Sequence, residues 1–64
     1  MYTDKQKAKF RRWVFTEVKK ERLDKDIARA MISEECFENG VLNYLDTYQV
    51  FTPEQKTFIM DFDK

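Results

Sequence analysis

The longest predicted helix covers residues 3–21, which read TDKQKAKFRRWVFTEVKKE. It starts with a capping box, because the Thr3 hydroxyl can accept a hydrogen bond from the amide of Gln6 while the Gln6 side chain reaches back to Thr3. We expect the helix to end at about Lys20 or Glu21. Only one Gly and one Pro occur in 64 residues, which favours further helices joined by very short connections.

Three more helix starts follow along the chain. Asp24 is an N-cap candidate for a short second helix. Ser33 caps a third helix, with Glu34 and Glu35 in its first turn, where the helix dipole favours negative charge. Residues 52–55, which read TPEQ, form a second capping box with proline at the first helical position and predict a fourth helix.

The end of the third helix is ambiguous. Asn39-Gly40 can terminate it, but four apolar residues recur at spacings of four, three and four across the glycine and keep one helix face apolar. They are Phe37, Val41, Tyr44 and Tyr48. Because an interior glycine costs only about 1 kcal/mol, we prefer one helix from Glu34 to Tyr48.

The small size of the chain limits its core. A domain of this length buries only about 60% of the surface that its unfolded chain exposes. It therefore needs large side chains, and 16% of its residues are aromatic. The sequence predicts an all-α fold: a small bundle of about four helices, the second of them short, that forms a single domain over residues 1–64.

The cysteine content and the hydropathy of the chain indicate the cellular compartment in which the protein is expected. Cys36 is the single cysteine, so no internal disulfide can form and a reducing compartment such as the cytoplasm is expected. The residues after Met1 contain no apolar secretory segment, and no apolar run approaches the roughly 18 residues needed to cross a bilayer. We expect a soluble cytoplasmic protein that does not contact a membrane.

Side chains that usually carry catalysis are scarce. The chain has no histidine, the residue that titrates nearest to neutral pH. Cys36 lies beside Glu34, Glu35 and Glu38, which would raise the pKa of its thiol. Two acidic pairs, Asp24/Asp26 and Asp61/Asp63, lack the ligand spacing and the turn glycine of a calcium loop. One glycine cannot build a phosphate-binding loop. We expect no catalytic residues, no metal site and no cofactor.

The net charge of zero hides an uneven distribution. Residues 1–22 carry eight basic and three acidic groups, a balance of +5, and the remaining residues carry four and nine, a balance of −5. On a helical projection, five basic residues of the first helix fall in one stripe, with Thr16 and no acid between them. This basic stripe consists of Lys5, Lys9, Arg12, Lys19 and Lys20. It indicates either a solvated face or a surface for phosphates or for an acidic protein.

The first helix also carries an apolar band that is wider than one core contact needs. Trp13 and Phe15 lie at opposite edges of this band. We expect one of them to be partly exposed and available to a partner or to a second copy of the chain. The competing interpretation is that short helices cover both edges. Arg11 interrupts the band beside Phe15, and arginine and tryptophan are enriched among residues that dominate binding energy.

Residues 26–35, DIARAMISEE, are similar to the first helix and turn of a helix-turn-helix unit. The resemblance implies a DNA-binding domain whose second helix enters the major groove. Here, however, that second helix opens with Glu34, Glu35 and Glu38, and carboxylates repel phosphates. Specific DNA recognition is therefore the alternative hypothesis.

The leading hypothesis is a small non-enzymatic binding protein that regulates or inhibits a macromolecular partner by protein–protein contact. The residues expected to bind this partner are Trp13, Phe15, Arg11 and Arg12. A contact area of about 800 Å² on each partner is within reach of so short a chain. The alternative is a DNA-binding transcriptional regulator with a divergent helix-turn-helix-like core and the basic stripe on its first helix. A homodimer formed through the same aromatic residues is compatible with both hypotheses.

Overall fold

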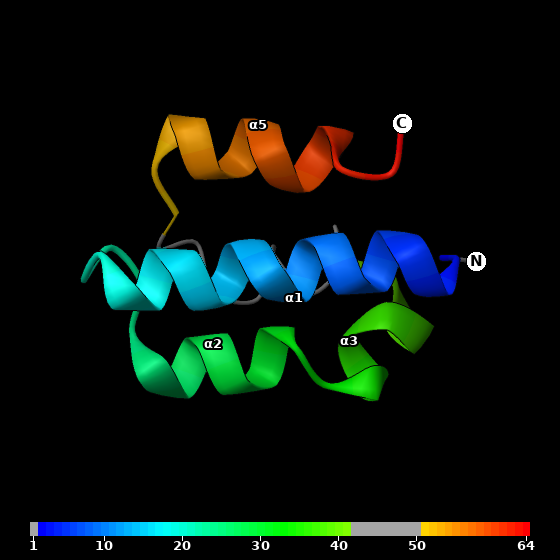
Figure 1. The fold of residues 1–64 in the computed structure, drawn as a ribbon, viewed down its shortest axis with the longest axis horizontal. Helices are drawn as coiled ribbons and strands as arrows, with labels where there is room; N and C mark the ends of the chain where they lie inside the picture. Colours follow the sequence, from blue (N-terminus) through cyan, green and yellow to red (C-terminus); the bar gives the residue numbers. More distant parts are fainter. Residues whose placement is uncertain (1, 42–50) are drawn as a thin grey trace.

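The computed structural model describes residues 2–41 and 51–64, and the regular structure in this part of the chain is α-helical. The helices are α1 (Asp4–Lys19), α2 (Lys25–Met31), α3 (Glu34–Asn39) and α5 (Pro53–Asp61). Helix α1 runs along the middle of the molecule, with α5 on one side and α2 and α3 on the other (Figure 1). The all-α fold predicted from the sequence, with its short second helix, is confirmed.

Both predicted capping boxes are present. At the start of α1 the amide of Gln6 donates to Thr3 Oγ1 over 3.1 Å, and the amide of Thr3 donates to Gln6 Oε1 over 2.8 Å. Thr52 and Gln55 make the same two bonds at the start of α5, with Pro53 in the first helical position. These bonds satisfy amides that have no partner within the helix, so the chain enters both helices where the sequence predicts.

Single side chains cap the two shorter helices. The Asp24 carboxylate accepts hydrogen bonds from the amides of Asp26 and Ile27 at the start of α2. The Ser33 hydroxyl accepts from the amide of Cys36 over 3.3 Å at the start of α3. Both predicted caps are confirmed.

Helix α1 ends in a left-handed turn. Lys20 is the C-cap, and the next residue, Glu21, has a φ of 61°. The amide of Glu21 donates to the carbonyl of Val18 over 3.0 Å, and the amide of Arg22 donates to the carbonyl of Glu17 over 2.9 Å. This pair of bonds is a Schellman motif, in which glycine usually occupies the position of Glu21. The end predicted at about Lys20 or Glu21 agrees with the structure to within one or two residues.

The end of helix α3 differs from the prediction. It ends at Asn39, and Gly40 takes a φ of 87° and a ψ of 122°, outside the helical region. The helix expected from Glu34 to Tyr48 is therefore wrong at Gly40, while Tyr44 and Tyr48 themselves lie outside the described residues.

The turn at Gly40 brings Val41 into the core. Val41 is 2% exposed, and its amide donates to the hydroxyl of Tyr2 over 3.3 Å. A positive φ suits glycine because glycine has no Cβ. The apolar spacing thus identified Val41 as a buried residue but did not distinguish a continued helix from a turn.

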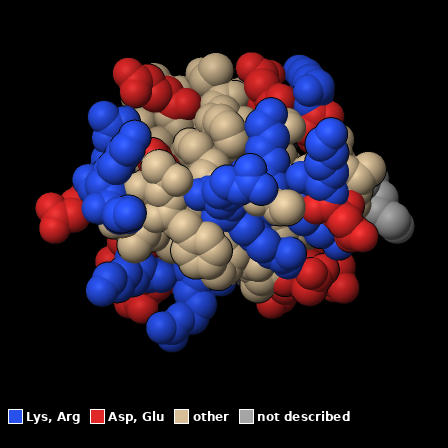
Figure 2. All heavy atoms as spheres, viewed as in Figure 1, with Lys and Arg blue, Asp and Glu red and all other residues tan. Residues whose placement is uncertain are grey.

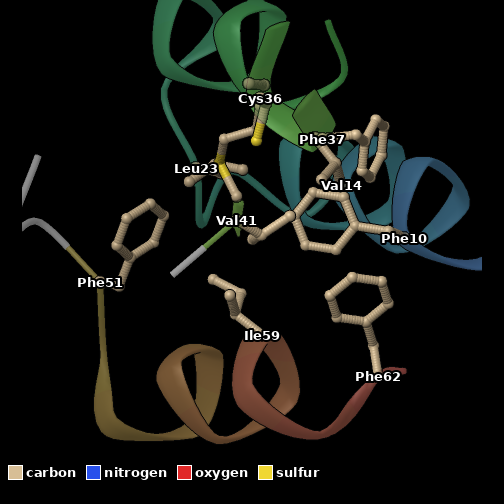
Figure 3. Close-up of a cluster of buried hydrophobic side chains, with 11 residues drawn as sticks. Phe10, Val14, Leu23, Cys36, Phe37, Val41, Phe51, Ile59 and Phe62 are labelled. Carbon is tan, nitrogen blue, oxygen red and sulfur yellow. The ribbon is translucent and has the colours of Figure 1, made fainter. Parts of the chain in front are cut away.

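The core lies on the side of α1 opposite the basic stripe. Phe10 and Val14 of α1 are completely buried. They pack with Leu23, Ala28, Met31, Cys36, Phe37, Val41, Phe51, Ile59 and Phe62 (Figure 3). The centroid of the Phe10 ring is 4.7 Å from that of Phe62 and 5.7 Å from that of Phe37. One aromatic cluster therefore joins α1 to α3 and to the end of α5.

A buried polar contact joins α5 to the end of α1. Gln55 Nε2 donates to Glu17 Oε1 and to the carbonyl of Arg22, each over 3.1 Å. Glu17 is 5% exposed and Gln55 is 3% exposed. A buried carboxylate is costly unless it is hydrogen-bonded, and in the described part of the chain every buried side-chain nitrogen or oxygen has a partner.

Candidate functional site

The outer surface of α1 is basic. All five residues of the basic stripe are exposed, as the helical projection predicts. Within residues 2–41 and 51–64, none of their side chains forms an ion pair. Lys and Arg side chains gather across the middle of this surface, and Asp and Glu lie mainly along its margins (Figure 2). The positive charge of the stripe is therefore directed to solvent or to a partner.

Phe15 lies at one edge of the stripe. Its side chain is 60% exposed, the largest exposed fraction among the large hydrophobic residues that the structure describes. Arg12 and Lys19 are three and four positions away on α1, so they are its neighbours on the helix surface. The edge of the apolar band that carries Phe15 is thus the one left open.

A groove between α1 and α2 begins at Phe15. It has a volume of about 190 Å³. Its apolar lining comes from Phe15 and Val18 of α1, from Ala28 of α2 and from Ile32, and its rim from Lys25 and Arg29. We call this feature the Phe15 groove. Both rim residues are exposed, so basic side chains continue from α1 onto α2.

Trp13 lies at the other edge of the apolar band and packs against α5. Its ring is stacked on Phe58, with centroids 4.3 Å apart and planes at 16°, and it also lies 5.8 Å from the ring of Phe10. Trp13 is half-buried. The sequence left open which of Trp13 and Phe15 is exposed, and the structure assigns that position to Phe15.

Arg11 makes intramolecular contacts. Its Nε donates to the carbonyl of Ile32 over 3.1 Å, and its guanidinium is 2.7 Å from the Glu34 carboxylate. The same guanidinium lies 5.0 Å from the centre of the Phe37 ring. Arg11 therefore holds the connection between α2 and α3 against α1. Arg12, the other arginine proposed from the sequence, is exposed.

The first acid of α3 is also engaged. Glu34 accepts from Arg11 and from Lys7, the latter over 3.3 Å. These two hydrogen bonds, that from Arg11 first, hold the pKa of the Glu34 carboxyl below its ordinary value. In a helix-turn-helix domain the residue at this position would approach the DNA phosphates. Here Glu34 pairs instead with two cations of α1, Lys7 and Arg11.

Cys36 has the environment of a core residue. Its side chain is completely buried, and burial raises the pKa of its thiol to about 11. The cause is desolvation, whereas the sequence suggested repulsion by the neighbouring carboxylates. A thiol with this pKa holds almost no thiolate at neutral pH.

A larger open hollow lies between the start of α1, α3 and the last residues of the chain. Its volume is about 900 Å³. Two of its polar side chains are already engaged, because Gln6 Nε2 donates to the carbonyl of Asp63 over 2.9 Å and Lys7 pairs with Glu34. The hollow therefore offers fewer free donors than its lining residues suggest.

Within residues 2–41 and 51–64, no three His, Cys, Asp or Glu side chains come together in a way that could hold a metal ion. None of the helices in those ranges has the length and hydropathy needed to cross a membrane.

Sequence reasoning missed Arg29 and Lys25 as parts of the basic surface. Both belong to the portion of the chain with an acidic balance, so a count by position along the chain separates them from α1. Their spacing of four residues within a predicted helix places them on one face and could have indicated a second basic patch.

Comparison of the chain with protein-family models, with curated proteins and with solved structures finds no match.

Proposed function

We propose that this protein is a small binding protein that regulates a macromolecular partner by covering part of the partner's surface. The contact is made to another protein, through Phe15 and the basic side chains around it. The observation that carries this proposal is the 60% exposure of Phe15 next to an apolar groove and to cations that form no ion pair among the described residues.

The energetics favour a contact at this position. Burying a Phe side chain stabilises a complex by about 1.5–3 kcal/mol, and much of that gain is still available at Phe15. Phe is among the residues enriched at protein interfaces, whose apolar centre is surrounded by a polar rim. The surrounding cations accelerate association with an acidic surface and make it sensitive to salt.

The roles proposed for individual residues follow their contacts. Phe15 is the apolar anchor and Arg12 is its charged neighbour. Trp13 and Arg11 act on binding only indirectly, because Trp13 stacks on Phe58 and Arg11 pairs with Glu34. Their substitution would affect the fold before it affects an interface.

A quantitative pull-down from extract tests this proposal, with two variants and two matched controls. Phe15→Ser and Arg12→Glu change the proposed surface. Met60→Ser and Lys56→Glu make the same chemical changes on α5, where Met60 is 54% exposed and Lys56 is also exposed.

We expect one or more captured proteins to be lost with Phe15→Ser, reduced with Arg12→Glu and retained with both controls. Circular dichroism should show that all four variants remain helical. Equal capture by the wild-type protein and by Phe15→Ser would contradict the proposal.

The second candidate function is DNA binding by the basic stripe. The observation that favours it is the exposure of five cations that form no ion pair with the described residues. Phosphate contacts release counterions, so the affinity should fall steeply as salt rises.

Fluorescence anisotropy with labelled duplex DNA of random sequence, at low and at moderate salt, tests this second candidate. Salt-sensitive binding that is weakened by Lys9→Glu more than by Lys56→Glu would rank DNA binding first. Absence of binding at low salt would eliminate it.

A further inference from the structure

The volume of the Phe15 groove limits what it can hold. At about 190 Å³, the groove is smaller than the roughly 300–1,000 Å³ of a small-molecule site. A groove of this size suits a single apolar side chain and not a whole small molecule. Its aliphatic lining, from Val18, Ala28 and Ile32, offers such a side chain burial without a polar cost.

The charges around the groove are distributed unevenly. Arg12 and Lys19 flank Phe15 on α1, and Arg29 lies on the α2 side. Three acids lie close to Lys25, in a neighbouring hollow at the connection between α1 and α2. They are Glu21, Asp24 and Asp26. These acids offset the charge of Lys25, so the positive charge around the groove is carried by Arg12, Lys19 and Arg29.

Two other occupants fit this surface less well. A second copy of the chain, packed symmetrically on the same face, would bring the two basic patches of Arg12, Lys19 and Arg29 against each other, and like charges at an interface cost several kcal/mol. A nucleic acid backbone would match the cations, but it would bring no aliphatic group to Val18, Ala28 and Ile32.

We infer that the Phe15 groove binds an acidic segment of a protein partner, which inserts one large apolar side chain between α1 and α2. This inference rests on the proposed function and adds the chemistry of the partner to it. The inserted side chain packs on Phe15, and carboxylates next to it in the segment pair with Arg12, Lys19 and Arg29.

A selection from a random peptide library tests the inference. A phage-displayed library of 16-residue peptides is panned on the immobilised 64-residue chain, and the enriched peptides are synthesised with a fluorescent label. We expect them to share one aromatic or branched apolar residue flanked by Asp or Glu. Enrichment of peptides without acidic residues, or no enrichment, would overturn the inference.

The binding site is then located with variants. The Kd of an enriched peptide should rise by about tenfold or more with Phe15→Ser and with Arg29→Glu, and rising salt should weaken binding. It should stay unchanged with Met60→Ser and Lys56→Glu, the matched changes on α5. A Kd that is the same for Arg29→Glu as for the wild-type protein would also overturn the inference.

The same variants separate this inference from the proposed function. If capture of a partner from extract depends on Phe15 but not on Arg29, the proposed function stands and the inference of an acidic partner segment is wrong. If DNA binds in a manner that depends on Phe15 and no acidic peptide does, both proposals fail and DNA binding replaces them. Thermal unfolding of Phe15→Ser and Arg29→Glu, followed by circular dichroism, confirms that each variant is folded before either result is interpreted.

Discussion

Trp13 and Phe15 are two positions apart on α1, yet their environments differ completely. Two positions correspond to about 200° around a helix, so the two rings point in nearly opposite directions. Helix α5 covers Trp13 with an aromatic ring of its own, Phe58. Helix α2 brings Ala28 and Arg29 to the other side, and Phe15 remains 60% exposed there. The comparison shows that the packing of the neighbouring helix, and not the apolar character of α1 alone, determines which edge is closed.

The largest expected effect comes from removing the two aromatic rings in turn. Trp13→Ala should lower the free energy of unfolding by about 2–4 kcal/mol, because a packed indole is lost and a cavity remains. Phe15→Ala should change it by less than about 0.5 kcal/mol, as is usual for exposed positions. Urea denaturation of both variants measures the difference. Equal losses would mean that Phe15 is part of the core.

A second test concerns the buried contact that holds α5 on the Trp13 side. Gln55→Ala should lower the free energy of unfolding by about 2–3 kcal/mol, because it removes a hydrogen bond to the buried Glu17 carboxylate and one half of a capping box. Gln6→Ala is the matched control, since it occupies the same place in the other capping box but its bonds are exposed. In the same denaturation experiment, Gln6→Ala should lower the free energy of unfolding by about 0.5–1 kcal/mol.

The stacking of Trp13 on Phe58 can be measured on its own. A double-mutant cycle of Trp13→Leu and Phe58→Leu should give a coupling energy of about 0.5–1.5 kcal/mol. The same cycle between Phe15→Leu and Phe58→Leu should be additive to within about 0.5 kcal/mol. Coupling in the second cycle would show that the two edges of α1 are not independent.

The smallest effect is expected at Glu34, which holds Arg11 beside the open edge. Its folded-state pKa lies below the ordinary value of 4.5, chiefly because Arg11 donates to it and then because Lys7 does. A carboxyl group whose pKa is lowered by folding stabilises the fold at pH values above its ordinary pKa. This contribution is lost as the pH falls through the folded-state pKa. The wild-type protein should therefore lose more thermal stability than Glu34→Gln between pH 5 and pH 3, by a small margin because the carboxylate is exposed. Glu35→Gln, next to it but outside any ion pair of the described residues, should behave like the wild-type protein.

Local signals allowed most of the helix boundaries to be predicted. A cap depends on side chains within three or four residues of the helix start. The N-caps of the helices that the structure describes, at Thr3, Asp24, Ser33 and Thr52, lie where the sequence places them. The basic stripe follows in the same way from the period of a helix. These features need no knowledge of what packs against them.

Other features depend on contacts between residues far apart in the chain. Gly40 turns the chain where Val41 enters the core and meets Tyr2, a contact across 39 positions that the apolar spacing cannot reveal. Arg11 was expected at an interface, but its partners come from the connection between α2 and α3. The basic surface extends to Arg29 only because α2 packs beside Phe15.

The sequence by itself determined the helical class, the starts of the helices and the basic face of α1, because each of these depends on neighbours within about one turn. Only the tertiary structure decided that Trp13 is packed, that Phe15 is open and that Arg11 is engaged. The physical reason is that burial is a property of pairs of elements. A residue at the edge of an apolar band is closed or open according to the side chain that the next helix brings to it.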